Sequence, residues 1–197
     1  MTTFPQLFLQ MSGTPGAGKT TLANALRPHL NAVILDHDTT KSAFLAEPDI
    51  FPSAGPASYI ALKAIATHLV SQGHTIIFDS PCFYTELLTF GQQLAHHHHI
   101  PYKYIECYLD DFDQLEHRLQ TRQSRPSQLI THLDQTITNG LGQQMSGRDH
   151  LRNWSQNMKR PHNTPYLRLD TSAPPHHCLQ QALTYLATPS TPSRHSE

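Results

Sequence analysis

Residues 13–20 have the types and spacing of a phosphate-binding loop. They match the pattern G-x-x-x-x-G-K-[ST] and are Gly13, Thr14, Pro15, Gly16, Ala17, Gly18, Lys19 and Thr20. Glycine lets successive backbone N–H groups turn toward one anion, and the N-terminus of the following helix adds partial positive charge. We expect Lys19 to reach the β- and γ-phosphates of ATP, and the Thr20 hydroxyl to take a coordination position on Mg²⁺. The pattern therefore predicts a nucleotide site.

A second candidate segment follows the apolar run 33–35 and contains Asp36, Asp38 and Lys41. In open α/β sheets ligands bind at the carboxyl ends of strands, so these side chains are placed to meet a γ-phosphate. Asp38 suits the carboxylate that orients an acceptor hydroxyl and takes its proton, and Lys41 suits the cation that balances transition-state charge. The alternative is an N-cap aspartate followed by an exposed lysine. Asp36 has a structural alternative of its own, which is to accept hydrogen bonds from the N–H groups of the turn.

A third apolar run, 75–78, ends in Asp79. An apolar strand that ends in aspartate is typical of the element that holds Mg²⁺ beside a phosphate-binding loop. This interpretation requires the strand to lie next to the first strand. The alternative is that Asp79, Ser80 and Pro81 only form a turn.

Three arginines, Arg118, Arg122 and Arg125, come at spacings of four and three residues. A guanidinium fork pairs well with phosphate oxygens, and a lid that carries arginines would also exclude water from the nucleotide. The stretch 123–150 is rich in Gln, Ser, Thr and Gly. This composition predicts an exposed, mobile flap without a core of its own, so we place a lid at about 122–150. Arg148 and Arg152 belong to the same basic segment with weaker support, and the alternative for each arginine is a solvated surface residue.

The charges are unevenly distributed, although the net charge of the 197 residues is −1. Residues 1–117 carry five Lys/Arg and eleven Asp/Glu, whereas residues 118–168 carry eight and two. One basic segment in a nearly neutral chain indicates a local phosphate site more than a surface that coats nucleic acid.

Cysteine spacing, apolar run length and a histidine tract exclude several classes. The three cysteines are far apart and fit no zinc or redox spacing, which predicts a reduced, cytoplasmic protein. No apolar run approaches the length needed to span a membrane. The tract 96–99 consists of four histidines, but no carboxylate or cysteine completes a metal site, so we expect a solvated helix end.

Strand and helix signals alternate along the chain, which predicts an α/β fold in three layers with a parallel sheet. The expected strands are 6–11, 32–36, 75–79, 103–109 and 166–169. Helices are expected at 85–97 and 175–187, in a segment that begins at Asp110 or Asp111, and through the apolar stripe Leu62, Ile65, Ala66 and Leu69. We expect a single domain over 1–187 and a disordered Pro/Ser/Thr-rich tail over 188–197.

The phosphate-binding loop and residues 34–41 together resemble the zeta-toxin and polynucleotide-kinase-like branch of the P-loop kinases, an AAA-type ATP-binding group. The resemblance implies the strand order 2-3-1-4-5, which places Asp79 beside the loop. It also implies that Asp38 is the acceptor base, that Lys41 contacts phosphate, and that Arg118, Arg122 and Arg125 are lid arginines. Zeta toxins carry longer helical additions, and nothing in this sequence corresponds to them.

The function expected from these features is transfer of the ATP γ-phosphate to a hydroxyl of a small molecule. One alternative is a polynucleotide 5′-hydroxyl kinase, in which Tyr102, Tyr104 and Trp154 would stack bases. Another is a nucleotide-binding switch without an acceptor. We expect the acceptor pocket within 42–60 and the flap, with Phe44, Phe51, Tyr59, Phe83 and Tyr84 as candidate lining residues.

Overall fold

A five-stranded parallel sheet forms the centre of the protein. The computed structural model describes residues 4–50, 53–123, 125–128, 130–138 and 144–189. The sheet strands are β1 (Phe8–Ser12), β2 (Ala32–Asp36), β3 (Thr75–Asp79), β4 (Tyr102–Tyr108) and β7 (Leu167–Asp170). They pair in the order β2-β3-β1-β4-β7, and every pairing is parallel. Because β7 is the fifth predicted strand, the predicted order 2-3-1-4-5 is confirmed.

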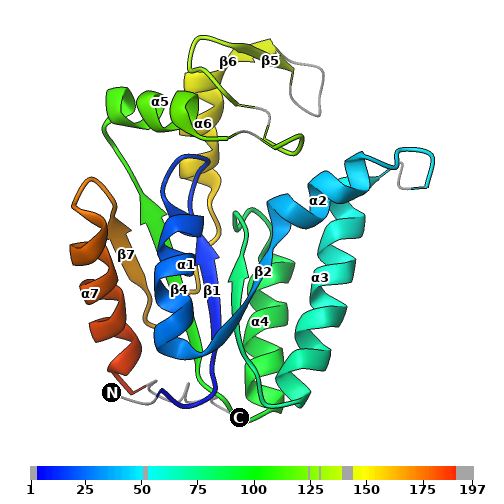
Figure 1. Cartoon of the computed structure of the whole chain (residues 1–197), viewed down its shortest axis with the longest axis vertical. Helices are drawn as coiled ribbons and strands as arrows, with labels where there is room; N and C mark the ends of the chain where they lie inside the picture. The colour runs from blue at the N-terminus through cyan, green and yellow to red at the C-terminus, as the bar shows by residue number, and fades with distance from the viewer. Residues whose placement is uncertain (1–3, 51–52, 124, 129, 139–143, 190–197) are drawn as a thin grey trace.

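Helices cover both faces of this sheet and complete the predicted three layers (Figure 1). The helices are α1 (Lys19–Leu30), α2 (His37–Leu45), α3 (Ala54–Ser71), α4 (Thr85–His97), α5 (Phe112–Thr121), α6 (Gly147–Asn157) and α7 (Pro175–Ala187). One core packs α1 and α7 against the sheet through Leu26 and Ala182, and a second packs α3 and α4 through Leu62 and Leu88. In α3 the predicted stripe is shifted, because Ile65 is exposed whereas Ala66 and Val70 are buried.

The register of the sheet brings the candidate site residues to one edge. Asp36 at the end of β2 lies opposite Asp79 at the end of β3. The phosphate-binding loop leaves β1, which pairs with β3 on one side and β4 on the other. Three carboxyl ends therefore meet at the loop, as parallel pairing requires.

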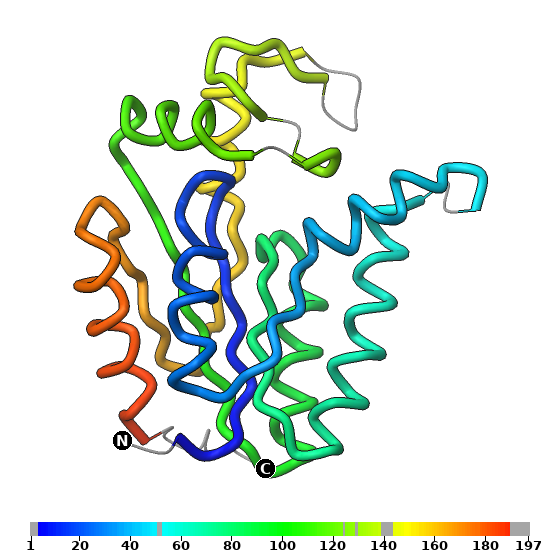
Figure 2. The backbone as a smooth tube through the Cα atoms, viewed as in Figure 1, coloured from blue at the N-terminus to red at the C-terminus, as the bar shows by residue number. Residues whose placement is uncertain are grey.

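The segment between α5 and α6 is folded, and we keep the name lid for it. The prediction of an exposed flap rather than a core element is wrong for its apolar residues, which are buried. It contains an antiparallel hairpin of β5 (Thr136–Thr138) and β6 (Gln144–Ser146). Buried side chains form a separate apolar cluster of Leu109, Leu115, Leu119, Ile130, Leu133, Ile137 and Leu151. In Figure 2 the lid lies above the carboxyl end of the sheet. The apolar residues of a polar segment thus find their partners on α5 and α6, which flank the hairpin.

None of the helices in the described ranges is both long and apolar enough to cross a membrane. Of the predicted tail, residues 190–197 lie outside the described residues.

Candidate active site

The phosphate-binding loop leaves the N-terminus of α1 open to an anion. Gly13 and Gly18 have φ angles of 135° and 82°, which L side chains rarely adopt, and a Cβ at Gly13 would collide with the carbonyl oxygen of Cys107. Within the described residues, no side chain caps the N-terminus of α1. Lys19 Nζ donates to the Thr14 carbonyl oxygen at 3.1 Å and so lies across the loop. The backbone N–H groups of the first turn and one ammonium group therefore face the same space.

Thr20 and Asp79 come together beside this loop and form a donor set that fits Mg²⁺. The Thr20 hydroxyl donates to Asp79 Oδ2 at 2.6 Å, and Asp79 is only 3% exposed. Burial raises the pKa of Asp79, against the charge of Lys19 and the bond from Thr20, and the charges of Asp36 and Asp38 add to the rise. A buried carboxylate and a hydroxyl, with further negative charge close by, are hard oxygen ligands of the kind that Mg²⁺ prefers.

Asp36 has a structural role at the start of α2. Its carboxylate accepts hydrogen bonds from the Thr39 amide at 3.1 Å and the Thr39 hydroxyl at 2.7 Å, as an N-cap residue does. It also forms an ion pair with Arg125 at 2.5 Å. This is the structural alternative set out for Asp36, and of the two carboxylates only Asp38 lines the cavities described below.

Asp38 lies in the first turn of α2 and is held as a carboxylate. Gln128 Nε2 donates to its Oδ2 at 2.9 Å, and His37 Nδ1 lies 3.8 Å from its Oδ1. Burial opposes ionisation, but the hydrogen-bonding groups of His37 and Gln128 and the charge of Lys19 outweigh it and hold the pKa of Asp38 well below its ordinary value. Lys41 follows one turn later on the same helix.

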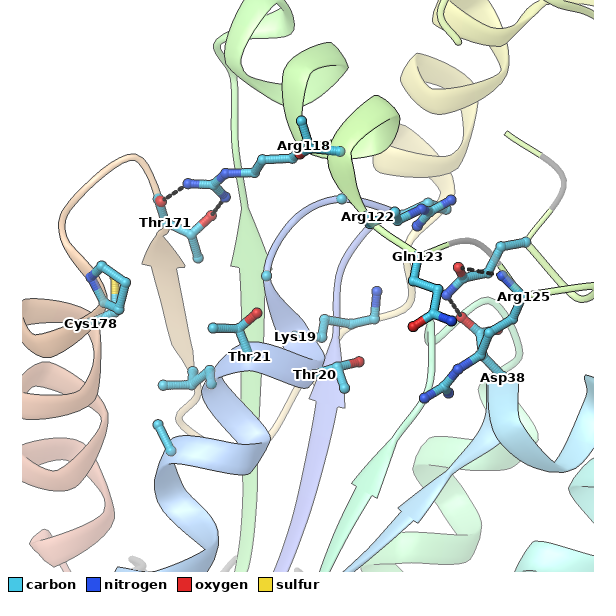
Figure 3. A pocket seen from close by; sticks show the side chains of 18 of the residues that line it. Lys19, Thr20, Thr21, Asp38, Arg118, Arg122, Gln123, Arg125, Thr171 and Cys178 are labelled. Carbon is cyan, nitrogen blue, oxygen red and sulfur yellow. Dashed lines mark hydrogen bonds between the residues drawn. The ribbon is translucent and has the colours of Figure 1, made fainter. Parts of the chain in front are cut away.

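All three predicted lid arginines form hydrogen bonds around a cavity of about 510 Å³ that Gly16, Gly18 and Lys19 also line. In Figure 3 Arg118 reaches Thr171, with Lys19 and Thr20 between that pair and Asp38. Arg118 Nη1 donates to Thr171 Oγ1 at 3.1 Å, and its Nη2 donates to the Thr171 carbonyl oxygen at 2.6 Å. The single hydrogen of the Thr171 hydroxyl can be donated to either of two carbonyl oxygens, that of Ala17 in the loop at 3.1 Å or that of Tyr108 at 3.0 Å. Arg118 is thereby tied to both the loop and the end of β7.

Arg122 and Arg125 line the same cavity in different states. Arg122 Nη2 donates to the Ile130 carbonyl oxygen at 2.7 Å, while its Nε is buried without a partner among the described residues. Burial lowers the pKa of Arg122. Arg125 is committed to α2, since its Nη1 binds both Asp36 and Thr39 at 2.5 Å, and the hydrogen bond to Asp36 raises its pKa. Arg122 is thus the lid arginine whose guanidinium keeps unused donors near the loop.

Arg148 and Arg152 serve the lid itself. Their guanidinium carbons lie 4.9 and 5.1 Å from the centre of the Phe112 ring, in cation–π contact. Both therefore stabilise the packing of α6 on α5. This structural role agrees with the weaker support for a functional role of these two positions.

A second cavity, of about 540 Å³, adjoins the first. Four residues line both cavities, namely Pro15, Lys19, Asp38 and Gln128. Lys41 lines the second cavity, as do three of the predicted pocket residues, Tyr59, Phe83 and Tyr84. Phe51 lies outside the described residues. The carboxylate of Asp38 and the ammonium of Lys19 therefore stand at the boundary between two spaces.

Several features were missed or misjudged from sequence. Thr171 and Gln128 carried no motif, although Thr171 directly follows the strand end at Asp170, where ligand-binding residues gather. Tyr102 and Tyr104 are buried in β4 at 8% and 0% exposure, so neither is placed to stack a base as the polynucleotide alternative requires.

The histidine tract at the end of α4 does not form a metal centre in the described part of the chain, where no group of three metal-binding side chains occurs.

Comparison with known proteins agrees with this geometry. A family model described as an AAA domain matches residues 9–139, from the first strand into the lid. The chain belongs to this AAA-domain family. No curated protein matches the sequence. The narrower assignment to the zeta-toxin and polynucleotide-kinase-like branch stays a prediction.

Solved structures similar to this AAA domain share its fold at low sequence identity. A protein from Chloroflexus aurantiacus J-10-fl, whose assignment as a kinase is itself provisional, is 21% identical with a TM-score of 0.63, and the match covers 92% of this chain and 98% of the other. The APS kinase CysC of Mycobacterium tuberculosis, solved with AMPPNP and APS, is 17% identical with a TM-score of 0.60, covering 93% and 99%. A gluconokinase from Sinorhizobium meliloti 1021 is 14% identical with a TM-score of 0.57, covering 94% of each chain.

Proposed function

We propose that the protein is an ATP- and Mg²⁺-dependent kinase that transfers the γ-phosphate to a hydroxyl of a small molecule. The observation that carries the proposal is the pair of adjoining cavities that share Lys19 and Asp38. A phosphotransferase needs a nucleotide site and an acceptor site that meet at the transferred group, with a cation and a carboxylate at the junction. The APS kinase and gluconokinase among the similar structures are named for acceptors that are small molecules.

The residues divide between the two substrates. The loop N–H groups and Lys19 hold the β- and γ-phosphates, and Arg118 with Thr171 borders the far end of the nucleotide cavity. Thr20 and Asp79 would hold Mg²⁺, which neutralises charge on the phosphates when bound. Arg122 and Lys41 supply further positive charge as the bond between the γ-phosphorus and the ADP oxygen breaks.

Asp38 orients the acceptor. Its carboxylate accepts a hydrogen bond from the acceptor hydroxyl, whose oxygen attacks the γ-phosphorus, and it takes the proton as the new P–O bond forms. A carboxylate with a lowered pKa is a weak base, which suits phosphoryl transfer, since the hydroxyl becomes acidic only late in a loose transition state. Orientation is therefore the larger part of its role.

The polynucleotide kinase alternative loses two of its three stacking residues, because Tyr102 and Tyr104 are buried, whereas Trp154 lines the second cavity. The switch alternative does not explain why the second cavity is lined by the carboxylate of Asp38 and the ammonium of Lys41, because a switch needs no acceptor site.

Transfer of labelled γ-phosphate from ATP with Mg²⁺ tests the proposal, using pooled hydroxyl metabolites and, separately, a 5′-hydroxyl oligonucleotide. We expect label in a small molecule. Label in the oligonucleotide alone would favour the polynucleotide alternative, and slow ADP release with no labelled acceptor would favour the switch.

A further inference from the structure

The second cavity changes character with distance from Lys19 and Asp38. Its remaining lining combines the charged side chains of Lys63 and Glu86 with rings that come from separate elements: Tyr59 on α3, Phe83 and Tyr84 after β3, and Trp154 on α6. We call these four aromatic residues the aromatic wall. A volume of about 540 Å³ is in the range of small-molecule sites, which take one compact ligand.

The rings of the aromatic wall contact one another and the neighbouring ring of His37. The Tyr59 ring stacks on the ring of buried His37 at 4.0 Å between centroids and an interplanar angle of 20°. Tyr84 meets Tyr59 edge-on at 5.9 Å, and Phe83 lies 5.2 Å from Trp154. These contacts fix the orientation of the rings before a ligand binds. Binding of a flat ligand would therefore cost little conformational entropy of these side chains.

Part of this lining remains uncovered. Tyr84 is 55% exposed and Ile60 is 66% exposed, and both line the cavity. Large apolar side chains left open within a concave site indicate a ligand that covers them with apolar surface. A polyol would instead require hydrogen-bonding partners for most of its hydroxyl groups, because burying an unpaired hydroxyl is unfavourable. The hydroxyl of Tyr59 is already directed to the Pro81 carbonyl oxygen at 3.4 Å.

We infer that the acceptor is a small alcohol that carries a flat aromatic ring. The inference rests on the proposed function and names the class of its acceptor. The ring lies against Tyr59, Tyr84 and Trp154, and the hydroxyl, on a short side chain, reaches the carboxylate of Asp38 at the boundary with the nucleotide cavity. Phosphate transfer then forms the acceptor P–O bond and releases ADP, as in the scheme above.

The single tryptophan of the chain provides a direct reading of this site. We would titrate the full chain with 4-nitrobenzyl alcohol, a quencher of indole fluorescence, and with D-gluconate as a ringless alcohol. We expect saturable quenching of Trp154 by 4-nitrobenzyl alcohol and no saturable change with D-gluconate. Quenching that only parallels that of free N-acetyltryptophanamide, without saturation, would overturn the inference.

Tyr84→Ala is the matched variant, because this exposed residue can lose its ring without opening the core. We expect the dissociation constant of 4-nitrobenzyl alcohol to rise roughly three- to tenfold, the range that one aromatic contact provides. Tyr166→Ala is the control. Tyr166 is 36% exposed and lies outside this cavity, so its replacement should leave the dissociation constant of 4-nitrobenzyl alcohol unchanged. Equal effects in the two variants would overturn the placement of the ring.

Phosphate transfer separates the inference from the function on which it rests. Label from ATP that enters D-gluconate or another polyol, but no aromatic alcohol, would overturn the inference and leave the kinase in place. Saturable quenching at Trp154 together with the absence of transfer to any acceptor would support the aromatic site and contradict the kinase.

Discussion

The side-chain amide of Gln128 binds the carboxylate of Asp38, with Nε2 donating to Oδ2 at 2.9 Å. Gln128 comes from the segment between α5 and the lid hairpin, and Asp38 from the first turn of α2. Ser127 adds to this connection, because its hydroxyl donates to the Asp38 carbonyl oxygen at 3.1 Å. The amide of Gln128 thus takes up one of the two oxygens of the carboxylate to which we assign the acceptor hydroxyl.

Replacing Gln128 with alanine should favour acceptor binding, because the acceptor hydroxyl would no longer compete with an amide. Hydrogen bonds to charged groups contribute about 1.5–3 kcal/mol, so we expect the KM for the acceptor to fall roughly tenfold while the KM for ATP stays constant. Steady-state kinetics with each substrate varied provides the test. Gln120→Ala, at an exposed position of α5, is the control. A lower kcat with an unchanged acceptor KM would show instead that Gln128 only holds Asp38 in position.

Asp79→Asn should stabilise the protein without ligands and remove its response to Mg²⁺. Since burial raises the pKa of Asp79, the folded protein binds this proton more tightly than the unfolded chain, and the associated stability is lost as pH rises through the folded value. At neutral pH the ionised carboxylate is therefore a cost that asparagine avoids.

Thermal unfolding measures both effects. In a domain of this size, each kcal/mol of unfolding free energy shifts Tm by about 2–4 °C. We expect a higher Tm for Asp79→Asn in buffer, and a loss of the extra Tm that Mg²⁺ with AMPPNP gives the native protein. Asp110→Asn, at an exposed position after β4, is the control. A variant that keeps its Mg²⁺-dependent shift would contradict the metal assignment.

Arg118→Ala should weaken nucleotide binding, because it removes the link between Thr171 and the cavity that the loop lines. Loss of charge-assisted hydrogen bonds of this kind should raise the dissociation constant of AMPPNP roughly tenfold. Arg148→Ala removes another lid arginine, one that packs on Phe112, and should leave the constant nearly unchanged. Calorimetric titration compares the two. If both variants bind equally well, Arg118 serves the lid fold alone.

The dependence of turnover on pH should show no acidic limb from Asp38 near neutrality. The pKa of this carboxylate is lowered in the folded protein. Its contribution to the stability of the fold is therefore complete above the pKa of the unfolded chain, about 3.9, and is lost only as pH falls through the lower pKa of the folded protein. With saturating Mg²⁺ and ATP, we expect the kcat contribution of Asp38 to be constant between about pH 5 and pH 8. An acidic limb in that range that moves in Asp38→Glu would contradict the assignment.

The central sheet was predictable because its strands are apolar runs buried on both faces. The bounds of 32–36 and 75–79, and of the helices 85–97 and 175–187, agree with the structure. The phosphate-binding loop was predictable because consecutive backbone N–H groups bind one anion, so its sequence pattern is contained in a short stretch of the chain. The strand order came from the resemblance, and the register then follows from parallel pairing.

Long-range packing explains what could not be predicted. Ile130, Leu133 and Ile137 have the i, i+3, i+7 spacing of a helix face but lie in irregular segments and in β5, and their partners Leu115 and Leu151 lie on helices to either side of the lid segment. The link between Gln128 and Asp38 joins residues 90 positions apart. The aromatic wall likewise depends on the fold, since Trp154 reaches Phe83 only after α6 returns across the sheet edge.

The most direct test of the proposed mechanism separates binding from transfer in Asp38→Asn. The account predicts that AMPPNP binds this variant with nearly the affinity of the native protein, while transfer of labelled phosphate to the acceptor falls by about 10²- to 10⁴-fold. Asp49→Asn, at an exposed position, should match the native protein in both measurements. Phosphate transfer at the native rate by Asp38→Asn would contradict the claim that this carboxylate joins the two cavities into one active site.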